Sequence, residues 1–250
     1  MWPYLLILAF LVVLPLVLIG YYALTDQQGE FTLLNFVRFF HRSEAINTFI
    51  YSIAIALITT IICIVLGYPA AYFMAMKSFG TPAVMAMLFI LPMWINFLLR
   101  TIATVELFHM FGLPLGEGAL LFGMVYDFLP FMIYPIYNTM QKIDTSLLEA
   151  ARDLGANRIK VFTKVVIPLS LPGVYSGIVM VFMPTVSTFA IAELLTQNKI
   201  TLFGSLIQRS FGEGGIAMWN YGAALSLIML IIIGLTSFFG NNNDTEDINR

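Results

Sequence analysis

Long apolar runs separated by short polar stretches set the pattern of the chain. Each run is close to the roughly 20 residues that a helix needs to cross a bilayer. The pattern predicts an all-α membrane protein with six spans, at about 2–23, 49–76, 82–99, 119–140, 173–195 and 221–239. The first run has no basic stretch before it and contains Pro3 and Pro15, so we expect a retained helix rather than a signal peptide.

These spans predict one transmembrane domain at residues 1–240, followed by a tail at 241–250 that we expect to be disordered and cytoplasmic. Charge in the short loops predicts the orientation, because Lys and Arg stay in the cytoplasm. With the N-terminus inside, five basic residues fall outside and seven inside, namely Lys77, Lys142, Arg152, Arg158, Lys160, Lys164 and Arg250. Both termini are therefore predicted to be cytoplasmic.

Composition excludes several function classes. Apolar residues make up 60% of the chain and charged residues 10%, against about 45–50% and about 25% in soluble domains. A net charge of -2 offers no basic surface, so we expect no nucleic-acid partner. The single cysteine, Cys63, and the distant His41 and His109 have no metal-ligand spacing. We therefore expect no metal site and no catalytic residues.

The polar segment at 141–172, between the fourth and fifth spans, has the pattern of two short amphipathic helices. Asp144 is a good N-cap, and Gly155 is suited to ending the first helix. A second apolar stripe follows Asn157 and leads to Pro168, where the next span begins. The pattern alone predicts a helix–turn–helix on the membrane surface, and its basic residues also fit contacts with anionic lipid headgroups.

One string in this segment resembles a known motif. Glu149, Ala150 and Ala151 are followed by three residues, Gly155, nine residues and then Val165-Val166-Ile167-Pro168. This resembles the EAA loop of ABC importer permeases, which reads Glu-Ala-Ala, three residues, Gly, nine residues, Ile, any residue, Leu, Pro. Longer strings, among them VYDFLPFMIYPIYNTMQKIDTSLLEAARDLGA, are similar to the spermidine/putrescine (PotB-type) permease family. Permeases for sulfate, molybdate and ferric iron share the loop but match the flanking strings less well.

The resemblance implies a six-helix type I ABC importer permease in the bacterial cytoplasmic (inner) membrane. In that family the EAA loop is a coupling helix that docks on a separate ATPase. It implies polar contacts from Glu149 and Asp153, close packing at Ala150 and Ala151, a turn at Gly155 and a helix start at Pro168. Glu149 also fits a purely structural role near its helix N-terminus.

The partners follow from the same resemblance. They are an ABC ATPase dimer, a second homologous permease, an extracytoplasmic substrate-binding protein and the lipid bilayer. This chain has no G-x-x-x-x-G-K-[ST] loop, so we expect ATP and Mg to bind the partner ATPase and no cofactor to bind here. The chain is thus expected to be a transporter subunit and not an enzyme.

Acidic residues within the spans are candidates for contact with a cationic substrate. Asp127 stands three residues before Pro130 and is the first candidate, with Glu193 second. Trp94 and Tyr126 offer aromatic faces to an ammonium group. Glu106 is expected to pair with Arg100 instead. Two alternatives stay open: an ABC permease for another small solute, and a secondary transporter that uses Asp127 as a proton relay.

Overall fold

The computed structural model describes residues 7–75, 87, 89, 91–212 and 216–246. These residues form helices, turns and one isolated β-bridge between Thr25 and Phe31, which confirms the all-α prediction. Three described stretches are long and apolar enough to cross a membrane: α4 (Ser43–Ala75), α7 (Glu117–Gln141) and the continuous stretch Arg158–Ser187. The shorter apolar helices Ala9–Ala23 and Met218–Gly234 add to them.

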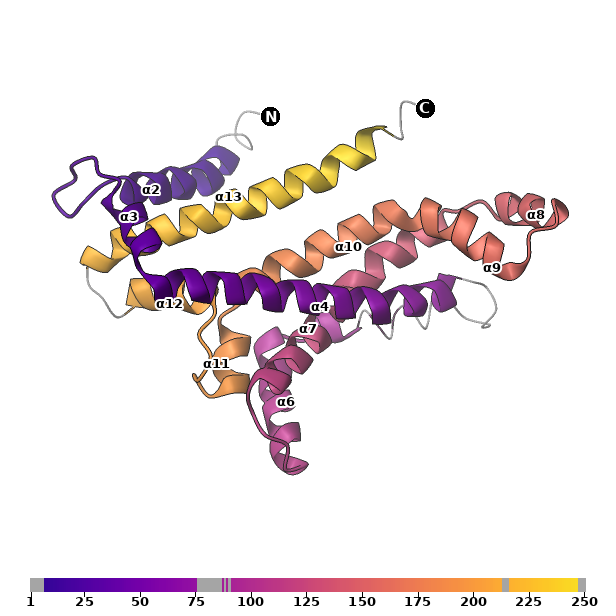
Figure 1. Cartoon of the computed structure of the whole chain (residues 1–250), viewed down its shortest axis with the longest axis horizontal. Coiled ribbons are helices and arrows are strands. Elements are labelled where there is room, and N and C mark those ends of the chain that lie inside the picture. Colours follow the sequence, from indigo (N-terminus) through magenta and orange to yellow (C-terminus); the bar gives the residue numbers. More distant parts are fainter. Residues whose placement is uncertain (1–6, 76–86, 88, 90, 213–215, 247–250) are drawn as a thin grey trace.

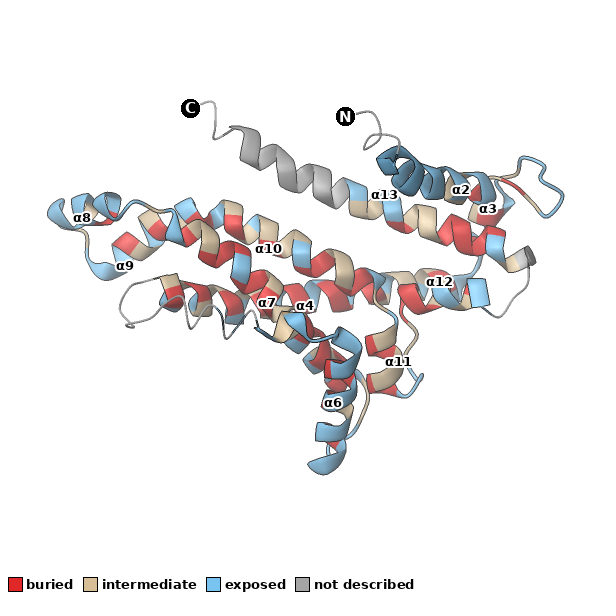
Figure 2. Ribbon diagram, turned by 180° about the vertical axis from the view of Figure 1, so that it is seen from behind, coloured by how far each residue is buried: buried red, intermediate tan, exposed pale blue. Residues whose placement is uncertain are grey.

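The centre of the fold is a bundle of α4, α7 and α10 (Ile167–Ser187), which lie side by side in Figure 1. Glycines allow α10 to approach α7 closely. A Cβ at Gly173 would lie 2.8 Å from the carbonyl oxygen of Pro135, and one at Gly177 would lie 2.7 Å from Sδ of Met132. These two glycines form a G-x-x-x-G pattern, which brings membrane helices into backbone contact. Figure 2 shows buried positions gathered where the three helices meet.

A second layer consists of α13 (Ile216–Glu246) and the N-terminal helix, which runs through η1 (Ala9–Val13) into α2 (Leu14–Ala23). The buried Asn220 amide of α13 donates to the carbonyl oxygens of Thr25, at 2.7 Å, and Tyr22, at 3.1 Å. From α3 (Leu34–His41), Asn35 donates to the carbonyls of Ala23 and Thr25. These amides satisfy the carbonyls left free where α2 ends.

The structure differs from the predicted spans at two internal breaks. Where 82–99 was expected to be one helix, a 3-10 turn η2 (Leu91–Trp94) is followed by α6 (Phe97–Met110), capped by Asn96 Oδ1, which accepts from the N–H of Leu98 at 2.8 Å. The fifth predicted span divides into α10 and α11 (Ala190–Thr196), because the backbone at Thr188 is extended. Hydropathy averages across such breaks and so does not detect them. Residues 76–86, 88 and 90 lie outside the described residues, and the six-span count stays a prediction.

The C-terminal segment also differs from expectation, because α13 continues to Glu246, inside the predicted tail 241–250. After Gly240 the tail contains no Gly or Pro to stop the helix. In Figure 1, α8 (Thr145–Asp153) and α9 (Arg158–Val161) lie at one end of the long axis, and α12 (Phe203–Gly212) lies toward the other. The N-terminal end of α2 and the C-terminal end of α13 both point toward the α8 end (Figure 1).

Candidate functional site

The first half of the 141–172 segment forms the predicted helix. The Oδ1 atom of Asp144 accepts from the backbone N–H of Ser146 at 2.9 Å, and α8 begins at Thr145. This contact lowers the pKa of Asp144, because the N–H group stabilises the carboxylate. The capping residue is therefore charged at neutral pH and favours the start of the helix.

Helix α8 ends in a Schellman motif centred on Gly155. The N–H of Gly155 donates to the carbonyl of Arg152 at 2.8 Å, and the N–H of Ala156 donates to that of Ala151 at 3.0 Å. Gly155 has φ +81°, the left-handed conformation that glycine adopts without strain. A Cβ at this position would meet nothing within 4 Å. The need for glycine is thus one of backbone conformation and not of space.

The second half of the segment joins the bundle without a break. Asn157 Oδ1 accepts from the N–H of Lys160 at 2.8 Å, and α9 then runs through the π-helical turn η3 (Phe162–Val166) into α10. Leu148, Val161 and Val166 are buried in the same apolar cluster as Met140 of α7. The helix–turn–helix is therefore packed against the bundle and not loosely tethered to it.

The outer face of this segment carries exposed apolar side chains among charged ones. Leu154 is 89% exposed, Ile159 72% and Leu147 48%. Five of the candidate coupling residues are exposed and one, Ala151, is half-buried; the exposed ones are Glu149, Ala150, Asp153, Gly155 and Pro168. Beside α8, a cavity of about 630 Å³ is lined by Glu149, Arg152 and Lys142 together with the ends of α4 and α7. We name the exposed face of residues 147–159 the EAA face.

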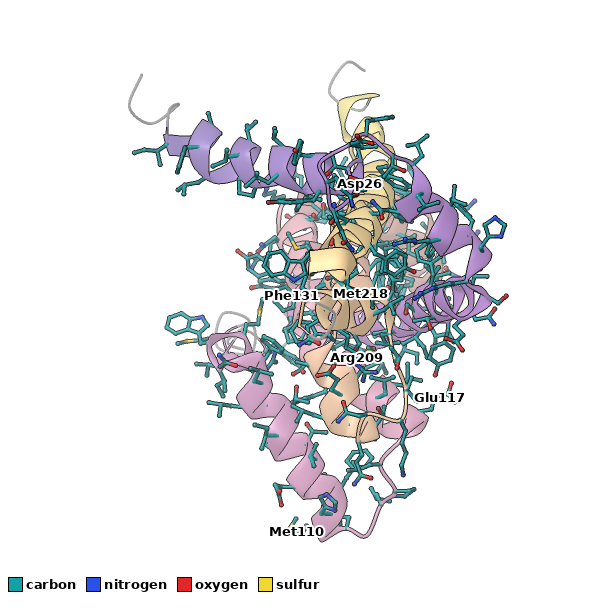
Figure 3. All side chains as sticks on the ribbon, turned by 90° about the vertical axis from the view of Figure 1, so that its left-hand side faces the viewer. Asp26, Met110, Glu117, Phe131, Arg209 and Met218 are labelled. Carbon is teal, nitrogen blue, oxygen red and sulfur yellow. The ribbon has the colours of Figure 1, made fainter. Side chains whose placement is uncertain are left out.

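A second cavity, of about 650 Å³, lies between α6, α7 and the break that separates α10 from α11. Its polar lining consists of Asn96, Arg100, Ser187 and Thr188. Its aromatic lining includes Trp94, Phe97, Phe128, Phe131 and Phe189. We call it the aromatic cavity. In Figure 3, α6 leads away from the bundle to Met110, and Phe131 lies near the bundle end of this arm.

Asp127 lies behind the wall of the aromatic cavity, in an ion pair with Arg100. The Nε atom of Arg100 is 3.2 Å from Oδ1 of Asp127, and the two side chains are 5% and 1% exposed. The hydroxyl of Thr101 lies 3.1 Å from Oδ2 and can donate to it. The structure thus pairs Arg100 with Asp127 in place of Glu106, which is exposed on α6. Both members of this pair are buried, and each provides the opposite charge that the other needs away from water.

The remaining candidates for the substrate pathway do not lie together in the aromatic cavity. Trp94 is 84% exposed and belongs to the cavity lining, and the ring of Tyr126 has the guanidinium carbon of Arg100 5.7 Å from its centroid. Glu193, half-buried in the first turn of α11, is not among the described residues that line the cavity. Sequence reasoning missed Arg100 as a site residue, because its partner belongs to a different helix.

Comparison with known proteins identifies the family. The model of the binding-protein-dependent transport system inner membrane component matches residues 64–243. The chain belongs to this family. Among relatives in the family, the spermidine/putrescine transport system permease protein PotB of Escherichia coli K12 is 35% identical over 251 residues, which cover 91% of this chain and 90% of that protein. The PotB of Haemophilus influenzae is 34% identical over 75% of this chain and 71% of its own length.

Solved structures show the same fold. A chain of the inward-facing MetNI methionine ABC transporter has a TM-score of 0.63 at 19% identity, covering 79% of this chain and 93% of that chain. A chain of a bacterial ABC transporter that imports alginate has a TM-score of 0.70 at 16% identity, covering 96% and 93%. These likenesses define the fold as that of an ABC importer permease. The family's inner-membrane location agrees with the apolar helices, and the relatives are transporter subunits, not enzymes.

Proposed function

We propose that this chain is the permease subunit of an ATP-driven polyamine importer, coupled to a separate ATPase through the EAA face. The observation that carries the proposal is the EAA face itself: two short helices with defined ends, anchored in the bundle, leave Leu154 and Ile159 uncovered. Burying a Leu or Ile side chain contributes about 1.5–3 kcal/mol. A partner protein that covers this face removes these side chains from water, and the complex is stabilised by that free energy.

The ATPase is proposed to supply the energy, with ATP and Mg bound on that partner. A dimer of ATPases needs two docking helices, so a second permease, either a copy or a relative, completes the transporter. The similarity to PotB, over nearly the full length of both proteins, supports spermidine and putrescine as substrates. An extracytoplasmic binding protein would deliver them, as the family description indicates.

The proposed orientation places the α8 end in the cytoplasm, with both termini on the same side. Two observations support this arrangement. The basic residues of the 141–172 segment favour the cytoplasm, and the ends of α2 and α13 point toward α8 (Figure 1). The aromatic cavity then lies toward the outer side of the bundle, where α10 ends at Ser187.

The aromatic cavity is the proposed part of the substrate pathway in this subunit. Ammonium groups are attracted to aromatic faces, which Trp94, Phe128 and Phe131 supply here. The cavity also contains Ser187 and Thr188 at the C-terminal end of α10, where helix carbonyls carry partial negative charge. A polyamine in this cavity would find several weak contacts, which suits a carrier that must also release its substrate.

The test is to purify the assembled transporter through a tag on this chain and to place it in liposomes. We expect an ATPase and a second permease to copurify, and spermidine with the binding protein to stimulate ATP hydrolysis and uptake. Recovery of the chain alone, with uptake driven by a proton gradient without nucleotide, would refute the proposal in favour of a secondary transporter. Stimulation by sulfate or ferric iron in place of spermidine would refute the polyamine assignment only.

A further inference from the structure

A buried ion pair separates the aromatic cavity from the carboxylate of Asp127. Arg100 is part of the cavity wall, and Asp127 is not among the described lining residues. A cation in the cavity therefore meets the guanidinium group before it meets the carboxylate. In this conformation the cavity presents a positive charge to a substrate that is itself positive.

The ion pair is close but poorly aligned. Nε of Arg100 and Oδ1 of Asp127 are 3.2 Å apart, yet they do not form an aligned hydrogen bond. Within the described part of the chain, Oδ1, Nε and Nη1 have no hydrogen-bond partner. Strong Arg–carboxylate pairs use two parallel hydrogen bonds. The two charges neutralise each other, but Oδ1 of Asp127 remains available to a donor that is better aligned.

The guanidinium group has other contacts that keep it stable if the carboxylate changes partner. Its Nη2 atom donates to the backbone carbonyl of Asp127 at 3.3 Å, and its central carbon lies 5.7 Å from the ring centroid of Tyr126. An aromatic face and a carbonyl oxygen both stabilise a cation. Arg100 therefore keeps two favourable contacts when the carboxylate changes partner, and these reduce the cost of leaving its buried charge unpaired.

We propose that Arg100 is a specificity-determining residue: it is the resident counter-ion of Asp127, and an ammonium group of the polyamine replaces it during transport. An ammonium has three donors and can align one with Oδ1. A second ammonium of the same molecule would meanwhile contact the aromatic wall at Phe128 and Phe131. A monoamine makes one of these contacts but not both, so it does not displace Arg100.

This inference rests on the proposed function, so the experiment starts from the wild-type transporter in liposomes and compares spermidine uptake in three variants. Arg100→Gln removes the competitor of the substrate for Asp127. Arg100→Gln combined with Asp127→Asn removes both charges and keeps a polar side chain at each position. Glu106→Gln is the matched control, because it removes an exposed carboxylate from the same helix. Pull-down measures the amount of assembled transporter in each case.

For Arg100→Gln we expect the KM for spermidine to fall about threefold or more, and butylamine to inhibit uptake that it does not inhibit in the wild type. For the double variant we expect uptake per assembled transporter to fall about tenfold or more. Unchanged KM and unchanged butylamine inhibition in Arg100→Gln would overturn the proposal. A double variant that transports within about twofold of wild type would also overturn the proposal. A double variant that does not assemble would overturn it too, because the pair would then stabilise the fold and not the substrate. A wild-type transporter without polyamine uptake would instead overturn the proposed function.

Discussion

Replacing Gly155 tests whether the end of α8 couples the permease to its ATPase. The residue has φ +81° and open space around its Cβ position, so a substitution strains the backbone without causing a clash. The left-handed conformation costs a residue with a Cβ roughly 1–2 kcal/mol. If the chain leaves this conformation, the two Schellman hydrogen bonds at Gly155 and Ala156 are lost as well.

A penalty of one to two kcal/mol lowers the population of the native turn by a factor of about 5–30. Because Leu148, Val161 and Val166 anchor the segment in the bundle, we expect the loss to fall on the geometry of the EAA face and not on membrane insertion. Gly155→Val should therefore weaken binding of the ATPase by about 5–30-fold. Gly155→Asn should weaken it less, because Asn tolerates this conformation better.

The assay is the affinity of the purified ATPase for the permease in nanodiscs, with ATP-driven uptake measured in parallel. Gly112→Val is the matched control, because Gly112 also has positive φ, at +64°, and no atom within 4 Å of its Cβ position, yet it follows α6, far from α8. Unchanged ATPase affinity in Gly155→Val, or an equal loss in Gly112→Val, would refute the reasoning.

Three further predictions concern the segment and the bundle. Glu149→Lys should uncouple uptake and lower the affinity for the ATPase about tenfold while membrane insertion stays normal. The reason is that it reverses an exposed charge beside Arg152 and Lys142. Normal recovery of the ATPase in a pull-down would contradict the role of Glu149. Gly173→Ala should lower the free energy of unfolding by about 1–3 kcal/mol, since its Cβ would lie 2.8 Å from a backbone oxygen. Gly234→Ala should not, because the space around that Cβ position is open. Thermal unfolding in detergent measures both variants. The cap of α8 should be fully formed above the unfolded pKa of Asp144, about 3.9. It should be lost as the pH falls through the lowered pKa of Asp144 in the folded protein. Hydrogen exchange at the Ser146 amide measures the cap, and exchange that does not depend on protonation of Asp144 would exclude it.

The segment at 141–172 shows what short-range pattern can predict. Asp144, Gly155 and Asn157 each satisfy backbone groups within a few residues of themselves, so their roles follow from local sequence. The helix–turn–helix and its ends could therefore be predicted without knowledge of the rest of the fold. The same holds for the apolar character of α4, α7 and α10, which is a property of each run alone.

Contacts between distant elements could not be predicted in this way. Arg100 and Asp127 lie on separate helices, and nothing in the spacing of the sequence favours that pair over Arg100 with Glu106. The break at Thr188 is also hidden, because hydropathy averages over the largely apolar helices α10 and α11 that flank it. Its significance depends on the cavity beside it, and this cavity exists only once α6 and α7 pack against α11.

The continuity of α9, η3 and α10 gives the molecule a single stiff rod from Arg158 to Ser187, 30 residues or about 45 Å in length. One end adjoins the EAA face, on which the ATPase is proposed to dock, and the other end forms part of the wall of the aromatic cavity. A small tilt of the helix at Arg158 would displace its other end, at Ser187, sideways, because no flexible loop lies between the two ends. A bend in this helical stretch would be expected at the wide turn of η3, at Pro172 or at Pro184, which makes those positions the places to look for a hinge.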